Sequence, residues 1–405
     1  MVDTTARAGQ AVPSVYVALE VQPIINARGC TTAVGGSLMW PEAARAMVEA
    51  ARAFVVVEEL NRAVGERIAA ATGAEAGYVT AGSAAGMLLA AAACITGTDP
   101  ARIHALPDTS GMANEIVVHR THRLRYDQMF RAAGARLVEI GVQQATEPWE
   151  LEAAIGDRTA AVAYYDSPAV GPNALDFATV VRVAHARDVP VIVDAASTLP
   201  PVDHLRRWVR WGADLVIYSG GKGIRGPQDS GLLAGRADLI AAAAANGAPN
   251  AAIGRGMKVS KEAMVGLAVA LDRFLAHDHE RDFAAHRAQA ESIQAALASR
   301  PDVRCEVIAD PERYPEPVLN LYPVGTSWSP RGLRDALVAG SPSIHANAEG
   351  GALGIHTHCL EPGDDERIAE RVADVLDGGR AAPAADGHAA GAGPSTVRLG
   401  STRGE

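Results

Sequence analysis

The chain has 405 residues, a length typical of two domains. Hydrophobic residues make up 48% and charged residues 21%, which is typical of a soluble globular protein. Its net charge of −10 disfavours a nucleic-acid partner, because phosphate binding requires a basic face. Four widely spaced cysteines without a CxxC pair predict neither a disulfide framework nor a metal site, and the apolar stretches are too short to span a bilayer.

The N-terminus shows no basic segment followed by an apolar one, so we expect no signal peptide and a cytoplasmic location. Residues 1–22 are expected to form an N-terminal arm. One long helix is then predicted from Pro41 to Thr72, with proline at a favourable first position.

Short β-rich runs alternate with helical segments from residue 77 to residue 234. Strands are expected at Gly77–Thr80, Glu115–Val118, Arg136–Ile140, Ala160–Tyr165, Val189–Val193, Asp214–Tyr218 and Gly231–Ala234. Helices are expected at Ser83–Ile95, Asp127–Ala133, Glu150–Ala154, Phe177–Arg187 and His204–Trp211. This alternation predicts an α/β fold with a seven-stranded, mostly parallel sheet and helices on both faces, in a large domain over residues 23–256.

The pattern changes near residue 257, where a smaller α+β domain is expected to begin and to extend to residue 377. Its predicted helices are Lys261–Ala276, Arg281–Ser299 and Asp364–Leu376, and its predicted strands are Val303–Ile308, Val318–Tyr322, Ser343–Ala346 and Leu353–Thr357. Residues 378–405 are rich in Ala, Gly and Pro and are expected to form a disordered tail.

A glycine turn follows the first predicted strand of the large domain. In this turn Gly82, Ser83 and Ala84 open an Ala-rich helix. Free N–H groups and the positive end of the helix dipole make such a turn an anion site, and small residues let a phosphate approach the backbone. The same pattern fits an ordinary packing turn equally well.

Two charged residues follow neighbouring strands later in the chain. Asp194 ends the apolar run Val191-Ile-Val, and Lys222, 28 positions later, stands among glycines just after Ser219. At a strand end, Asp194 would pair with the pyridinium nitrogen of pyridoxal 5′-phosphate (PLP), and a desolvated Lys222 would form a Schiff base with its aldehyde. The alternatives are that Asp194 caps a helix or binds a metal, and that Lys222 lies in a surface turn.

A polar loop after the second predicted strand contains His122. This histidine would stack on the open face of the cofactor or transfer substrate protons. The alternative is a purely structural histidine. Three arginines in the loop, at positions 120, 123 and 125, indicate either an anionic neighbour or a solvated loop. The order of anion turn, histidine loop, aspartate and lysine predicts a PLP site more strongly than any one motif.

With these motifs the chain resembles the aspartate-aminotransferase-like PLP enzymes of fold type I, in the branch of bacterial L-seryl-tRNA(Sec) selenium transferase and of proteins like D-glucosaminate-6-phosphate ammonia-lyase. The segments that carry the resemblance are 25–29, 35–39, 80–86, 106–111, 193–196, 219–228, 253–258 and 341–344. Among them, Ser219-Gly-Gly-Lys-Gly-Ile-Arg-Gly-Pro-Gln228 is the most specific.

The resemblance implies a homodimer or higher homo-oligomer with shared active sites, and a role for each matching residue. Lys222 would be the Schiff-base lysine and Asp194 the partner of the pyridine nitrogen. Gly82, Ser83, Ala84 and Ser219 would surround the phosphate, and Ala196 would lie against the ring face opposite His122. Candidates for substrate or phosphate contact are Arg225, Gln228 and Arg255.

Some residues near these motifs depart from the family pattern. Arg28 and Cys30 stand where relatives carry small or hydroxyl residues, and Arg28 either binds a substrate carboxylate or forms a surface ion pair. His356 and His358 either reach the site or cap a strand of the small domain. A short arm of low charge makes a tRNA substrate unexpected.

The activity implied is that of a lyase acting on a small amino acid or amino-sugar acid, by α-proton abstraction and α,β-elimination. The alternatives are an aminotransferase, a racemase or a β-replacement enzyme, since all need the same PLP and Lys222. A non-catalytic protein of the PLP fold and a nucleotide-binding protein also stay open, although no GxxxxGK[ST] motif is present.

Overall fold

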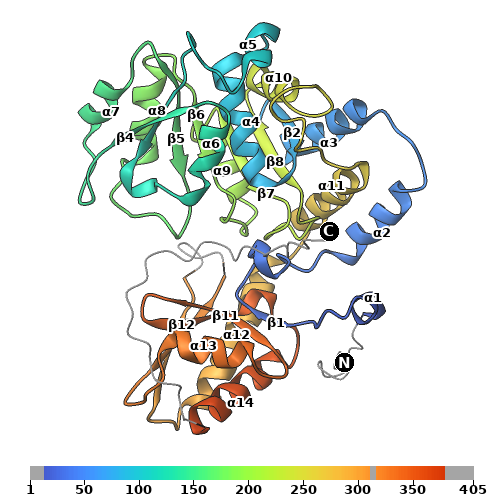
Figure 1. Ribbon diagram of the computed structural model, residues 1–405, viewed down its shortest axis with the longest axis vertical. Helices are drawn as coiled ribbons and strands as arrows, with labels where there is room; N and C mark the ends of the chain where they lie inside the picture. The colour runs from blue at the N-terminus through green and yellow to red at the C-terminus, as the bar shows by residue number, and fades with distance from the viewer. Residues whose placement is uncertain (1–12, 311–315, 379–405) are drawn as a thin grey trace, which may run out of the picture.

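The computed structural model describes residues 13–310 and 316–378, which form two units, each with its own sheet (Figure 1). The predicted arm, apart from residues 13–22, and the predicted tail, apart from Gly378, lie outside the described residues. Within the described part, no helix is long and apolar enough to cross a membrane.

The larger unit contains a seven-stranded sheet. Its strands are β2 (Ala76–Thr80), β3 (Glu115–His119), β4 (Arg136–Ile140), β5 (Thr159–Tyr165), β6 (Val191–Asp194), β7 (Leu215–Ser219) and β8 (Gly231–Gly235). The order is β2-β8-β7-β6-β5-β3-β4, and β8 alone among them runs antiparallel to its neighbours. Strands β3 and β8 are buried along their whole length. The continuous small and apolar residues of β8 predict this for a sheet covered on both faces, and β3 has such residues at Ile116–Val118. The predicted strands are therefore confirmed, each within two residues.

Helices cover both faces of this sheet, and the sheet lies between two apolar cores. They are α3 (Val57–Thr72), α4 (Gly82–Thr96), α5 (Pro100–Ala105), α6 (Gln128–Ala132), α7 (Pro148–Ala154), α8 (Phe177–His185), α9 (His204–Arg210), α10 (Ala237–Asn246) and α11 (Lys261–Leu275). Of these, α4 and α10 pack on one core, whereas α3, α8, α9 and α11 pack on the other.

The single helix predicted from Pro41 to Thr72 is wrong, because the structure has α2 (Pro41–Ala50) and then α3, separated by residues 51–56. The separating segment ends in Phe54-Val55-Val56, all of them exposed. Consecutive aromatic and β-branched residues lower helix propensity and cannot share one buried helix face.

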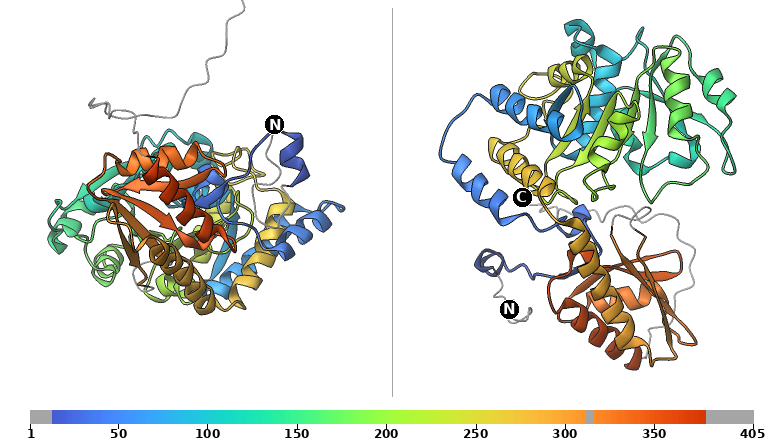
Figure 2. Two further views of the ribbon diagram at one scale, coloured as in Figure 1. Left: turned by 90° about the horizontal axis from the view of Figure 1, so that it is seen from below. Right: turned by 180° about the vertical axis from the view of Figure 1, so that it is seen from behind.

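The smaller unit contains a five-stranded sheet of order β1-β11-β12-β10-β9. Its strands are β1 (Ile25–Ala27), β9 (Val303–Ile308), β10 (Val318–Pro323), β11 (Ile344–Glu349) and β12 (Ala352–His356), and its helices are α12 (His279–Leu297), α13 (Pro330–Val338) and α14 (Asp364–Asp377). The strand β1, which the sequence patterning did not indicate, pairs in parallel with β11. Seen from behind, α11 lies with the larger unit and α12 with the smaller one (Figure 2).

Candidate active site

The carboxyl ends of β6 and β7 lie side by side in the larger sheet. The strand β6 ends at Asp194, its parallel neighbour β7 ends at Ser219, and Lys222 follows three residues later. Ligands of open α/β sheets bind at this edge. The structure thus brings the predicted aspartate and lysine to one edge of the sheet.

Lys222 faces a cavity between the two units. Its Nζ donates a hydrogen bond to Ser197 Oγ at 3.3 Å, and both residues line a cavity of about 510 Å³. Burial lowers the pKa of Lys222, while the charges of Asp194 and Cys30 act in the opposite direction. A lysine with a lowered pKa has a larger fraction of the neutral amine that imine formation and proton abstraction require.

The glycines around Lys222 are required by the packing of their own turn. An added Cβ at Gly221 would overlap the backbone of Gln228, and one at Gly223 would overlap the carbonyl oxygen of Leu199. These backbone contacts, and not room for a flat ligand, are therefore the first physical reason for the glycines. They allow two backbone segments to approach closely and so fix where Lys222 leaves the chain.

Asp194 is held by the backbone just beyond its strand. Its Oδ1 accepts a hydrogen bond from the Ala196 N–H at 3.0 Å. Burial raises the pKa of Asp194, and the Ala196 N–H and the charge of Lys222 reduce this effect. A buried carboxylate is costly without a cationic partner, so the site is suited to a ligand that presents a positive N–H group.

The amino end of α4 folds over β8 at the same edge of the sheet. Gly82 opens this helix with a φ of +78°, and the Ala81 side chain gives no cap to the N–H groups of residues 82–84. Gly231 lies close beneath, because a Cβ there would be 2.6 Å from the Gly82 carbonyl carbon. Since Gly231 also pairs with Ser219 in register, the end of β7 lies near the first turn of α4, whose uncapped N–H groups suit an anion.

His122 is buried beside the strand that neighbours Asp194. It is 2% exposed, and its Nδ1 accepts a hydrogen bond from the backbone N–H of Tyr165 at 3.3 Å, the residue paired with Asp194 in register. Burial, with a contribution from His119, lowers the pKa of His122 to about 3. The ring is therefore neutral near pH 7, which favours the stacking role over the proton-transfer role.

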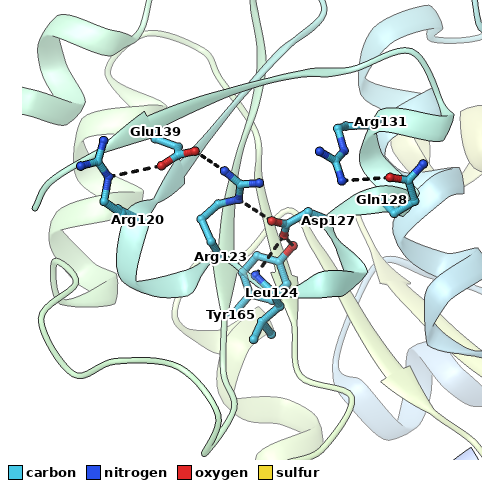
Figure 3. Close-up of polar contacts among 8 residues, drawn as sticks. All are labelled: Arg120, Arg123, Leu124, Asp127, Gln128, Arg131, Glu139 and Tyr165. Carbon is cyan, nitrogen blue, oxygen red and sulfur yellow. Dashed lines mark hydrogen bonds and ion pairs between the residues drawn. The ribbon is translucent and has the colours of Figure 1, made fainter. Parts of the chain in front are cut away.

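Two of the three arginines of the histidine loop, Arg120 and Arg123, form ion pairs within the protein (Figure 3). Arg123 contacts both Asp127 and Glu139, and Arg120 Nε lies 3.3 Å from Glu139 Oε2. The buried Asp127 also accepts a hydrogen bond from the Tyr165 hydroxyl at 2.8 Å. This network ties the loop to β4 and β5 and thereby positions His122.

The cavity of Lys222 receives residues from both units. The larger unit contributes Ser167 and Ser197. In the smaller unit, the loop after β1 contributes Arg28 and Cys30. The other lining residues of the smaller unit are Asn320 of β10, Asn347 of β11, His356 of β12 and His358 just after β12. Both histidines line the cavity, which decides between the two positions that the sequence left open for them. Of the other lining residues, Ser197 directly follows the Asp194 motif, but the polar residues of β10 and β11 gave no local sequence signal.

Arg28 is oriented inside this cavity by an asparagine of the smaller sheet. Its Nε donates to Asn347 Oδ1 at 3.2 Å, and Asn347 Nδ2 donates to the Arg28 carbonyl oxygen at 3.3 Å. No ion pair of Arg28 is found among the described residues. Its guanidinium is thus placed to bind an anionic group of a ligand.

The other three predicted substrate residues lie outside the large cavity. Arg225 covers the ring of Trp40 at 3.9 Å and lines a small neighbouring cavity with Lys222. Gln228 is exposed, and its Nε2 donates to the Thr32 carbonyl oxygen at 3.3 Å. Arg255 is exposed and lines a separate cavity of about 140 Å³. Within the chain described, Arg225 shares only the small cavity with Lys222, and Gln228 and Arg255 line neither cavity of Lys222.

The small-domain side of the cavity has unusual charge properties. Burial lowers the pKa of His356 to about 4. Burial acts in the same direction on His358, but the charge and hydrogen bond of Cys30 and the charge of Glu316 raise the pKa of His358 to about 9. A hydrogen bond from Cys359 holds the pKa of Cys30 well below its ordinary value.

Comparison with known proteins identifies the family. The family described as L-seryl-tRNA selenium transferase matches residues 24–286, more than half of the chain. The chain belongs to the selenium transferase family. The match includes every residue predicted for the PLP site, from Arg28 to Arg255.

Two curated relatives and one solved structure are similar to this chain. The chain is 39% identical over 292 residues to D-glucosaminate-6-phosphate ammonia lyase of Salmonella typhimurium, covering 71% of this chain and 76% of the relative. It is 35% identical to 5′-C-glycyluridine monooxygenase-decarboxylase of a Streptomyces species, covering 89% and 92%. A solved structure of D-glucosaminate-6-phosphate ammonia-lyase superposes with a TM-score of 0.80 at 32% identity, covering 91% and 99%. The predicted family and the predicted fold type I are confirmed.

Proposed function

We propose that this member of the selenium transferase family is a PLP-dependent lyase that acts on a small amino acid or amino-sugar acid. The observation that carries the proposal is the placement of Lys222 and Asp194 at neighbouring strand ends, with the amine facing the cavity. The ammonia lyase named above supports the reaction class, because it is 39% identical to this chain.

The residues present fit PLP in their chemistry. The uncapped N–H groups of Gly82, Ser83 and Ala84, together with Ser219, suit its phosphate. Asp194, whose burial calls for a cationic partner, suits its pyridine nitrogen. Lys222 suits its aldehyde carbon. Bound PLP supplies an electron sink for the negative charge that forms when a proton leaves the substrate.

The flat ring requires apolar neighbours on its two faces. His122 is neutral and buried, and Ala196 presents a small side chain just beyond Asp194. We infer that the ring lies between these two residues. The buried network of Asp127 and Arg123 then affects the ring indirectly, because it fixes the loop that carries His122.

Proton transfer is assigned to Lys222 and substrate binding to the smaller unit. A neutral Lys222 amine, oriented by Ser197, accepts the α-proton at Nζ. Arg28, held by Asn347, binds the substrate carboxylate or another anionic group. These assignments place the reacting carbon between the sheet edge of the larger unit and the polar residues of β10 and β11.

A second candidate is favoured by the extent of one alignment. The relative named monooxygenase-decarboxylase aligns over 89% of this chain, and so extends into the smaller unit. The same lysine and the same cavity would then serve a reaction that consumes O₂ and releases CO₂. Transamination, racemisation and β-replacement remain alternatives that use the same proton-accepting lysine.

The test combines a cofactor measurement with a product assay. Purified protein should carry the visible absorbance band of PLP bound to a lysine, and borohydride reduction followed by peptide mass spectrometry should find the modification at Lys222. A panel of amino acids and amino-sugar acids is then assayed for ammonia, CO₂ and O₂ uptake. Ammonia and a keto acid without O₂ uptake support the lyase, whereas coupled O₂ uptake and CO₂ release support the second candidate. A chain that binds no PLP, or binds it elsewhere, contradicts both.

We also propose a homodimer. Apolar side chains exposed on the single chain include Val15 of α1 (Ser14–Ala18), Leu19 just after it, and the fully exposed Phe54 before α3. Contact with a second copy would remove such side chains from water. Light scattering should give twice the mass of one chain, and Phe54→Asp should shift the protein toward the monomer. A monomeric parent protein would contradict the proposal.

A further inference from the structure

Three soft ligands meet on the small-domain side of the cavity. Cys30 lies in the loop after β1, and His358 and Cys359 lie in the 3-10 helix η4 (Thr357–Cys359) that follows β12. One ligand atom from each residue lies within 4.8 Å of the others. The two sulfur atoms are 3.7 Å apart, although the residues are 329 positions apart in the chain.

The separation of the sulfur atoms matches a shared metal ion. A Zn–S bond of about 2.3 Å and a tetrahedral angle place two thiolate sulfurs about 3.8 Å apart. A disulfide would require a separation of about 2 Å, so the observed spacing fits ligation without movement. The prediction that the cysteines form no metal site rested on their spacing along the chain. Strand β1 pairs with β11 in the smaller sheet, and the loop after it brings Cys30 next to Cys359 despite that spacing.

His358 offers a ring nitrogen to the same point. Its Nδ1 is buried and has no hydrogen-bond partner among the described residues. Gly29 packs against the ring, because a Cβ there would lie 3.0 Å from His358 Cε1, and its φ of +82° is one that glycine adopts without strain. Glycine thus allows the loop that carries Cys30 to pass directly over the imidazole.

We propose that Cys30, His358 and Cys359 bind a thiophilic divalent cation, Zn²⁺ in the first instance. Two thiolates balance the charge of the ion, so the ligated cluster is neutral and suited to a partly buried position. Three protein ligands leave one of the four tetrahedral positions for water or a substrate atom. Because Cys30 and His358 both line the cavity of Lys222, that position lies within reach of a ligand in the cavity.

The metal content of the full-length protein tests the proposal. Reduced protein with its natural cofactor content is dialysed against Zn²⁺, freed of loose metal, and measured by inductively coupled plasma mass spectrometry and by competition with a chromophoric chelator. We expect one ion per chain. Cys30→Ser, Cys359→Ser and His358→Ala should each weaken Zn²⁺ binding by more than about 100-fold, which exceeds the usual effect of losing an outer-shell partner.

Cys305→Ser is the matched control, because this half-buried cysteine lies in β9, outside the cluster. Cobalt gives a second readout, since Co²⁺ in the site should show thiolate charge-transfer bands and visible d–d bands that disappear in Cys30→Ser. Circular dichroism checks that each variant is folded.

Three results would overturn the proposal. They are reduced parent protein that retains no ion, equal loss of Zn²⁺ in Cys305→Ser, and a pair that forms a Cys30–Cys359 disulfide on treatment with a low-molecular-weight disulfide while binding no metal after reduction. The last result would identify a redox pair instead of a metal site. None of these measurements depends on lyase activity, so failure here and failure of the proposed function are distinguishable.

Discussion

Replacing His122 separates a stacking role from a proton-transfer role. With a pKa of about 3, His122 would be protonated in about one molecule in ten thousand at pH 7. Removal of a true general acid or base costs about 10²–10⁴-fold in rate. A residue that only stacks can be replaced by another flat ring, so we expect His122→Phe to keep kcat within about tenfold and His122→Ala to lose more.

The Phe variant has one structural cost that must be measured beside activity. It removes the acceptor of the Tyr165 N–H, and an unpaired buried donor costs about 1–3 kcal/mol. A lower melting temperature is therefore expected even where kcat is preserved. Asn at position 122 would offer an acceptor without the ring, and should weaken PLP binding while stabilising the fold relative to Phe.

The assay is a pH profile of kcat with PLP occupancy followed by absorbance. The stacking role predicts that His122→Phe leaves the pH profile unchanged in shape. If the folded and PLP-loaded Phe variant loses more than about 100-fold in kcat, or loses one limb of the profile, the reasoning from burial is refuted.

Three further outcomes are expected. Asp127→Asn should lower the free energy of unfolding by about 2–3 kcal/mol in urea titrations, because the buried carboxylate that pairs with Arg123 is lost. Arg131→Ala removes only an exposed hydrogen bond of 2.9 Å to Gln128 (Figure 3) and should change the same free energy by at most about 0.5 kcal/mol. Gly223→Ala should reduce PLP occupancy, measured by absorbance, since the new Cβ would overlap the Leu199 carbonyl oxygen; unchanged occupancy would contradict this. His119 has a pKa of about 4 when folded against 6.5 when unfolded, so the unfolded state takes up its proton first as the pH falls. His119 should then contribute a drop in stability of about 3 kcal/mol between pH 6.5 and 4. In His119→Phe the total drop should be smaller by this amount, while the buried His122 and His356 keep their own contributions.

Local patterns in the sequence were sufficient for the larger sheet. Runs such as Val191-Ile-Val and Leu215-Val-Ile-Tyr are apolar without alternation, which predicts strands buried on both faces. Because consecutive parallel strands end at one edge, the chain order of Asp194 and Lys222 already implied that they would lie near each other. The structure places their strands as direct neighbours.

Long-range pairing is what the sequence did not reveal. The three residues of β1 are too few for a periodic pattern, yet they cross to the smaller sheet and carry Arg28 and Cys30 into the cavity. The sequence places glycines beside Lys222, but the reason for them lies in backbone segments such as Leu199 that contact them across the fold. Neither the pairing of β1 with the smaller sheet nor the contact of Leu199 with these glycines can be predicted from spacing along the chain.

The division of the cavity between two units bears on which reaction the protein performs. The family match ends at residue 286, so it includes Lys222, Asp194 and the anion turn but not Asn320, Asn347 or the two histidines near β12. The matched half suits the chemistry common to PLP enzymes, and the other half contacts whatever is bound beside it. Substrate choice should therefore be determined by the cavity residues of β10–β12 and of the segment just after them. Exchange of one such residue should change the KM values for different substrates more than it changes the rate of proton transfer to Lys222.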